Sequence, residues 1–141
     1  MQHRGIYGIW LDARGRIPLI RKSRGPYTGL LDLPGGTPEV GETPEQTLRR
    51  ELVEECGVTA ARVLSWHEFD FVVLRDSLGD AIDFRHSGLI AVLDVSQQPS
   101  PVRDVEDVSM VELRDPRRLT VGECSALLLE GLTHVGVVLD I

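Results

Sequence analysis

The stretch from Gly36 to Val58 constrains the fold more than any other part of this 141-residue chain. It joins a glycine-rich turn to a helix whose two ends are both defined by the sequence. Thr43 suits the N-cap and Pro44 the first helical position, and Gln46 completes a capping box with Thr43. Gly57 suits the left-handed conformation that ends many helices. The sequence therefore predicts one helix between Thr43 and Gly57.

This predicted helix has two unlike faces. On a helical wheel of about 100° per residue, one arc is apolar and is formed by Leu48, Leu52, Val53 and Cys56. The opposite arc is acidic and is formed by Glu51, Glu54 and Glu55, with Arg50 at its edge. A solvated charged face is the simpler interpretation of such an arc.

Two costs argue against a merely solvated acidic face. Like charges at helical neighbour spacing cost roughly 0.2–0.5 kcal/mol per pair, and glutamates in a last turn oppose the negative end of the helix dipole. A hard divalent cation resolves this conflict, because Mg²⁺ binds carboxylate oxygens and keeps waters and substrate phosphates as further ligands. The acidic face therefore indicates a metal site for phosphate chemistry.

The same stretch resembles the signature of the Nudix hydrolases at every fixed position. The matching residues are Gly36, Glu42, Arg50-Glu51-Leu52, Glu54-Glu55 and Gly57-Val58, preceded by the lead-in Leu33-Pro34-Gly35. The order of strands and helices predicts an α/β fold. The resemblance implies a Nudix-type α/β/α sandwich with a mixed β-sheet, and a single Nudix hydrolase domain over residues 1–141.

The resemblance also implies roles for the residues of this box. Glu51, Glu54, Glu55 and the backbone carbonyl of Gly35 are the expected ligands of Mg²⁺, with Mn²⁺ as an alternative cofactor. The expected catalytic residues are Glu51, first choice as the base for a metal-activated water, Glu54, and Arg50, which orients a neighbouring glutamate. Glu42 is expected to brace the loop before the helix or to assist the metal without binding it directly.

Similar proteins commonly supply one further carboxylate from outside the box. Residues 102–107 carry three candidates, Asp104, Glu106 and Asp107. We favour Glu106 as the additional metal ligand, with Asp107 next, and a charged loop without a role is the simpler interpretation.

The segment before the box contains the expected substrate contacts. Arg21 and Arg24 are predicted to reach the substrate phosphates, although solvated charge explains them equally well. Tyr27 is a candidate for stacking on a base, against the simpler interpretation of a packed tyrosine. His67 and His86 lie in predicted strands, and we expect both to be structural.

Outside the box, alternating and apolar runs predict strands at residues 4–11, 17–20, 61–74, 81–95 and 108–113. The first two are expected to pair as a hairpin, and residues 61–74 to form one or two strands. Thr120 and Glu123 form a second capping box, which predicts a helix up to about Leu132. The apolar tail, residues 135–141, suits an added strand or the contact of a homodimer.

Charge and cysteine content exclude several classes of function. A net charge of −7 argues against a protein that binds duplex nucleic acid through its phosphates. Cys56 and Cys124 have no CxxC spacing, so neither zinc nor redox chemistry is indicated, and Cys56 is expected to be a buried thiol. Residues 1–15 contain no apolar core of signal-peptide type, and no run approaches the ~18 apolar residues of a membrane span. We therefore expect a cytoplasmic protein without a membrane partner.

The first hypothesis for the activity is hydrolysis of a nucleoside diphosphate linked to another group. Val73 and Leu74 stand where relatives acting on ADP-ribose or on diadenosine polyphosphates often carry proline or tyrosine. By elimination we favour a (deoxy)nucleoside triphosphate as the small-molecule substrate. The alternatives are hydrolysis of ADP-ribose or another nucleotide-sugar, and a non-catalytic nucleotide sensor, against which the intact box argues.

Overall fold

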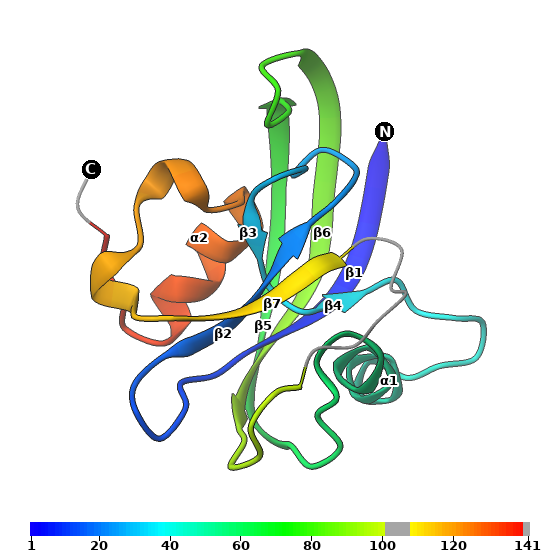
Figure 1. Ribbon diagram of the computed structural model, residues 1–141. Coiled ribbons are helices and arrows are strands. Elements are labelled where there is room, and N and C mark those ends of the chain that lie inside the picture. The colour runs from blue at the N-terminus through cyan, green and yellow to red at the C-terminus, as the bar shows by residue number, and fades with distance from the viewer. Residues whose placement is uncertain (101–107, 140–141) are drawn as a thin grey trace.

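The computed structural model describes residues 1–100 and 108–139, in which two helices lie on different sides of the strands (Figure 1). The strands are β1 (Gln2–Ile9), β2 (Ile17–Lys22), β3 (Leu31–Asp32), β4 (Gly35–Gly36), β5 (Arg62–Arg75), β6 (Ala81–Asp94) and β7 (Val108–Arg114). The helices are α1 (Pro44–Cys56) and α2 (Ala126–His134), with 3₁₀ turns at Pro116–Arg118 and Val121–Glu123. Within these residues, no helix has the length and apolar character to cross a membrane.

The strands form two sheets, with the orders β4-β1-β6-β5 and β3-β2-β7. The first sheet is mixed, because β1 and β6 are parallel whereas the pairs β1–β4 and β5–β6 are antiparallel. The hairpin expected from residues 4–11 and 17–20 is wrong, since β1 pairs with β4 and β6 whereas β2 pairs with β3 and β7. The turn itself is present, with the Asp12 N–H bonded to the Arg16 carbonyl at 2.8 Å, but it directs the chain into the second sheet.

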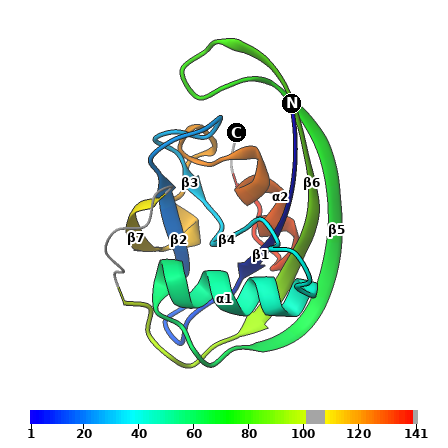
Figure 2. The same ribbon diagram turned by 90° about the vertical axis from the view of Figure 1, so that its right-hand side faces the viewer.

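Strand β1 separates two apolar clusters and thereby sets the layers of the fold. Ile6, together with Trp10 just after the strand, belongs to the cluster that contains the apolar residues of α1. Tyr7 and Ile9 belong to the cluster that contains the apolar residues of α2. Successive side chains of a strand point to opposite faces, so β1 is covered by one helix on each face (Figure 2). This confirms the α/β/α sandwich with a mixed sheet.

Helix α1 begins and ends where the sequence predicts. Thr43 Oγ1 accepts the Gln46 N–H at 3.2 Å, and Gln46 Oε1 accepts the Thr43 N–H at 2.9 Å. Gly57 has a φ of 66°, and its N–H donates to the Val53 carbonyl at 3.1 Å. Cys56 is buried with a free thiol, as expected.

The C-terminal part of the chain differs from the prediction. Glu123 accepts the Thr120 N–H at 2.8 Å, but this contact closes only a 3₁₀ turn. Cys124 is extended and forms a parallel bridge with Leu31, so the helix begins only after Ser125. Residues 135–139 form no strand, and Val135, Val137 and Leu139 pack against the core instead.

Candidate functional site

The predicted metal site lies where β4 meets the last turn of α1. The Gly35 N–H donates to Oε1 of Glu55 at 2.7 Å. Gly35 has a φ of 148°, and a Cβ at this position would collide with the carbonyl oxygen of Ile6. A Cβ on Gly36 would stand 2.7 Å from a carboxylate oxygen of Glu51. Two successive glycines therefore allow the backbone of β4 to lie directly against the carboxylates of α1.

Glu55 is buried, which corrects the helical-wheel assignment. Its exposed fraction is 4%, whereas Val53, assigned to the apolar arc, is 45% exposed. The covered side of α1 is centred on Leu48, Leu52 and Glu55, at positions i, i+4 and i+7, because β4 packs over the last turn. Burial, reinforced by the nearby Glu51 carboxylate, raises the pKa of Glu55 to about 8.

The other two glutamates of the acidic face have different surroundings. The Glu51 side chain is 13% exposed, and its Oε1 accepts a hydrogen bond from Arg50 Nη1 at 2.9 Å. Burial raises the pKa of Glu51 above its ordinary value. Glu54 is half-exposed and lies 3.4 Å from the same guanidinium. The face therefore runs from a buried carboxyl at Glu55 to a solvated one at Glu54.

Arg50 is fixed by contacts on several sides. Its Nε and Nη2 donate to the two carboxylate oxygens of Glu42 at 2.8 and 2.9 Å. Nη2 also donates to the Thr37 carbonyl at 3.0 Å. The hydrogen bonds from Arg50 hold the pKa of Glu42 down at about 2. Arg50 thus ties the loop before α1 to the acidic face, and Glu42 makes the bracing contact expected of it.

The donor groups at this site suit a hard divalent cation. Within residues 1–100 and 108–139, no three His, Cys, Asp or Glu side chains are already gathered at metal-ligand spacing. The remaining candidate ligands Asp104, Glu106 and Asp107 lie outside the described residues. The buried carboxyl group of Glu55 and the partly buried one of Glu51 nevertheless form an oxygen-rich site beside a glycine backbone, and the described contacts of Glu55 include no ion pair. A divalent cation would relieve the cost of ionising both carboxyl groups.

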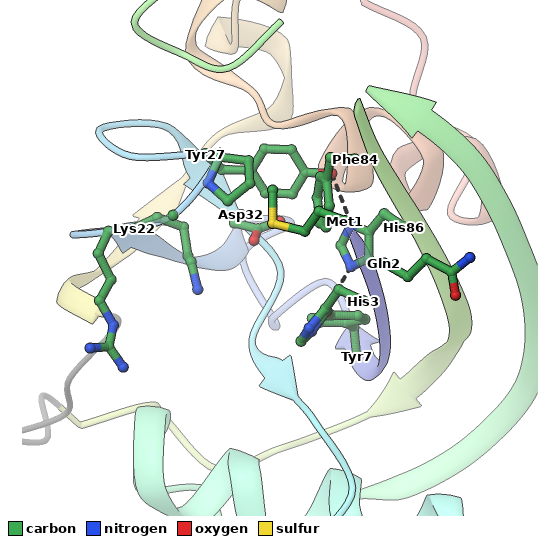
Figure 3. A pocket seen from close by; sticks show the side chains of 12 residues that line it. Met1, Gln2, His3, Tyr7, Lys22, Tyr27, Asp32, Phe84 and His86 are labelled. Atoms are coloured by element: carbon green, nitrogen blue, oxygen red, sulfur yellow. Dashed lines mark hydrogen bonds between the residues drawn. The ribbon is translucent and has the colours of Figure 1, made fainter. Parts of the chain in front are cut away.

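A pocket of about 280 Å³ is lined by residues that precede the box and by two residues of β6 (Figure 3). Its lining includes Tyr7, Lys22, Arg24, Tyr27, Asp32 and His86. Tyr7 pairs with Gly35 across β1 and β4, and Gly35 is bonded to Glu55. A ligand could therefore place one end in the pocket and another against the acidic face of α1.

The structure separates the three predicted substrate contacts. Arg24 and Tyr27 line the pocket, whereas Arg21 does not. Arg21 instead donates to Glu112 at 2.6 Å and to the Gly29 carbonyl at 2.9 Å. Tyr27 is a buried, packed tyrosine, and its ring stands edge-on to Phe84. Its ring therefore forms part of the pocket wall and is not free to stack on a base as predicted.

Tyr7 and Asp32 are among the pocket residues that the sequence analysis missed. His86, which we expected to be structural, also lines the pocket and joins the hydroxyls of Tyr7 and Tyr27, with each ring nitrogen 2.8 Å from one of them. Asp32 is buried at 3% exposure and accepts a hydrogen bond from Ser125 Oγ at 2.6 Å. A charged residue between Leu31 and Leu33 was the available signal, because Asp is rarely fully buried without a function or a partner.

Comparison with known proteins shows that this chain is similar to Nudix proteins over most of its length. A family model described as the NUDIX domain matches residues 1–128. An 8-oxo-dGTP diphosphatase of Haemophilus influenzae is 40% identical over 65 residues, which are 45% of this chain and 48% of that protein. An ADP-ribose pyrophosphatase of Bacillus subtilis is 31% identical over 115 residues, which are 80% of this chain and 60% of that protein. The chain thus spans roughly half the length of these curated relatives.

A solved structure supports the fold in the same way. The MutT NUDIX hydrolase of Burkholderia pseudomallei superimposes with a TM-score of 0.68, covering 96% of this chain and 98% of that one. Its sequence is 22% identical, so this likeness concerns the arrangement of strands and helices.

Proposed function

Because the chain belongs to the Nudix family, we propose that it is a Mg²⁺-dependent pyrophosphohydrolase acting on a nucleoside diphosphate linked to another group. One observation carries this proposal. The buried carboxyl group of Glu55 and the partly buried one of Glu51 lie against the glycine backbone of β4, whose strand partner Tyr7 lines a pocket. Folding alone gives no reason to bury one carboxyl group beside a second, partly buried one.

The carboxylates of Glu51, Glu54 and Glu55 and the Gly35 carbonyl are the proposed metal ligands, with Glu106 as the ligand from outside the box. A bound Mg²⁺ would neutralise charge on the substrate phosphates and lower the pKa of a water molecule. Mn²⁺ has a similar preference for oxygen ligands and is the alternative ion.

Glu51 is the proposed base. Burial raises the pKa of Glu51 towards the pH at which the enzyme works, and a base is most effective when its pKa lies near that pH. Arg50 donates a hydrogen bond to the Glu51 carboxylate and is itself held by Glu42. It therefore fixes the position of the Glu51 carboxylate. Arg50 is therefore proposed to be a positioning residue.

For the substrate we propose a (deoxy)nucleoside triphosphate. The relative from Haemophilus influenzae, an 8-oxo-dGTP diphosphatase, favours this choice. Hydrolysis of ADP-ribose is the second candidate, favoured by the relative from Bacillus subtilis that matches 80% of this chain. Cytoplasmic localisation, a homodimer and the absence of nucleic-acid partners stay predictions.

A panel assay tests the proposed function. Wild type is incubated with dGTP, dATP, 8-oxo-dGTP and ADP-ribose in Mg²⁺ or chelator, and released pyrophosphate or phosphate is measured. We expect turnover that requires the metal and falls at least about a hundredfold in Glu51→Gln. Glu45→Gln is the matched control, because Glu45 is an exposed glutamate in the first turn of the same helix. Tight binding of a panel member without turnover would establish the sensor function instead.

A further inference from the structure

The proposed chemistry leaves one buried carboxyl group of the pocket without a role. Asp32 is 3% exposed and lines the pocket (Figure 3). The Ser125 hydroxyl donates a hydrogen bond to it at 2.6 Å, the Leu33 backbone N–H donates another, and the charge of Lys22, which lines the same pocket, favours its ionised form. A carboxylate can accept about four hydrogen bonds, so these two leave part of its capacity open. Asp32 therefore brings unused acceptor capacity to the pocket.

Support of helix α2 is the simpler role for this residue. Ser125 Oγ accepts the Leu128 N–H at 3.0 Å and donates its own proton to Oδ1 of Asp32 at 2.6 Å. Asp32 thus orients the N-cap of α2. That role needs one acceptor oxygen, which an asparagine would also provide. It requires neither the second carboxylate oxygen nor the negative charge.

A second group in the pocket supplies a hydrogen-bond donor. The two ring nitrogens of His86 each lie 2.8 Å from a tyrosine hydroxyl, one from Tyr7 and one from Tyr27. Burial lowers the pKa of His86 to about 3, so the ring is neutral and carries a single N–H. One tyrosine therefore donates its O–H to His86. The other tyrosine accepts the His86 N–H and keeps its own proton for another acceptor.

We propose that Asp32 selects the base of the nucleotide by accepting the two adjacent donors, N1–H and the N2 amino group, of a guanine-type base. The tyrosine that keeps its proton is the donor for an acceptor such as O6. Adenine would place the lone pair of N1 against the carboxylate, which is unfavourable in a buried site. Guanine oxidised at C8 keeps the same N1–H and N2 amino donors, so the proposal applies equally to guanine and to its C8-oxidised form. It rests on the proposed function in that the ligand is a nucleotide.

Equilibrium binding of nucleoside monophosphates tests this proposal without requiring hydrolysis. Calorimetry compares GMP, IMP and AMP, because IMP keeps N1–H but lacks the N2 amino group. We expect GMP to bind at least about tenfold more tightly than AMP, with IMP between them. Asp32→Asn keeps an acceptor for Ser125 but presents an amide to the pocket, so the preference for GMP over AMP should fall about tenfold or more.

Ser125→Ala is the control for the structural role. It removes the contact with Asp32 and the cap of α2, so it should lower the melting temperature and leave the ratio of GMP to AMP affinity unchanged. Equal GMP and AMP affinities in wild type, or an unchanged ratio in Asp32→Asn, would overturn the proposal. The wild-type series decides the matter if Asp32→Asn does not fold. Selective GMP binding by a protein that hydrolyses no nucleotide would refute the proposed hydrolase and leave the role of Asp32 standing.

Discussion

Replacing Glu55 with glutamine should stabilise the metal-free protein. Glu55 is 4% exposed, and burial raises the pKa of its carboxyl from 4.5 to about 8. At pH 7.5 the unfolded chain has released this proton whereas the folded chain largely retains it, which lowers the free energy of unfolding by about 4 kcal/mol. Glutamine removes this cost and keeps an oxygen for the Gly35 N–H, but its amide must be buried. We therefore expect a net gain of about 1–3 kcal/mol.

The sign of the pH dependence follows from the same shift. Between pH 4.5 and about 8, the folded protein binds more protons at Glu55 than the unfolded chain does. The contribution of Glu55 to the free energy of unfolding therefore becomes less favourable as pH rises through this range. Glu55→Gln has no such dependence, so its advantage over wild type should be small at pH 5 and should grow towards pH 8.

Thermal unfolding in chelator at several pH values measures this effect. A gain of about 1–3 kcal/mol corresponds to a rise in melting temperature of about 3–10 °C for a domain of this size. Glu45→Gln is the matched control, since Glu45 is exposed and its replacement should change stability by less than about 0.5 kcal/mol. A Glu55→Gln protein that is less stable than wild type at pH 8 would refute the reasoning.

Three further substitutions test other contacts. Arg50→Lys keeps the charge but loses the two-pronged contact with Glu42, so denaturant unfolding should show a loss of about 1–3 kcal/mol, and unchanged stability would mean that the contact is unimportant. Tyr27→Phe leaves one nitrogen of His86 without a partner and should cost about 1–2 kcal/mol by the same measurement; an unaltered midpoint would contradict the shared network. Glu51→Gln should lower kcat at least about a hundredfold with little change in KM for a nucleotide, and a change confined to KM would remove Glu51 from the chemistry.

Local sequence signals predicted the parts of the fold that depend on neighbouring residues. The cap at Thr43 and the stop at Gly57 are determined within one turn of the chain, so α1 was predicted correctly. The pairing of β1 with β6 joins Gln2 to Arg85 and could not be found from a turn signal. The early part of the chain therefore suggested a hairpin that the longer-range pairing replaces.

In the candidate site too, features set by neighbouring residues were predicted and features set by long-range packing were not. The spacing of Glu51, Glu54 and Glu55 indicated one acidic face, but a wheel treats the helix as isolated. It could not show that β4 covers Glu55 and leaves Val53 exposed. Asp32 was missed because its neighbours in the pocket come from distant strands.

Binding of Mn²⁺ is the most direct test of the claim that the acidic face of α1 is a metal site. Electron paramagnetic resonance counts free Mn²⁺ as the ion is titrated into wild type, Glu55→Gln and Glu45→Gln. We predict saturable binding by wild type and Glu45→Gln, and an affinity at least about tenfold weaker in Glu55→Gln. Equal Mn²⁺ affinities in all three proteins would contradict the assignment of Glu55 as a ligand and with it the metal site.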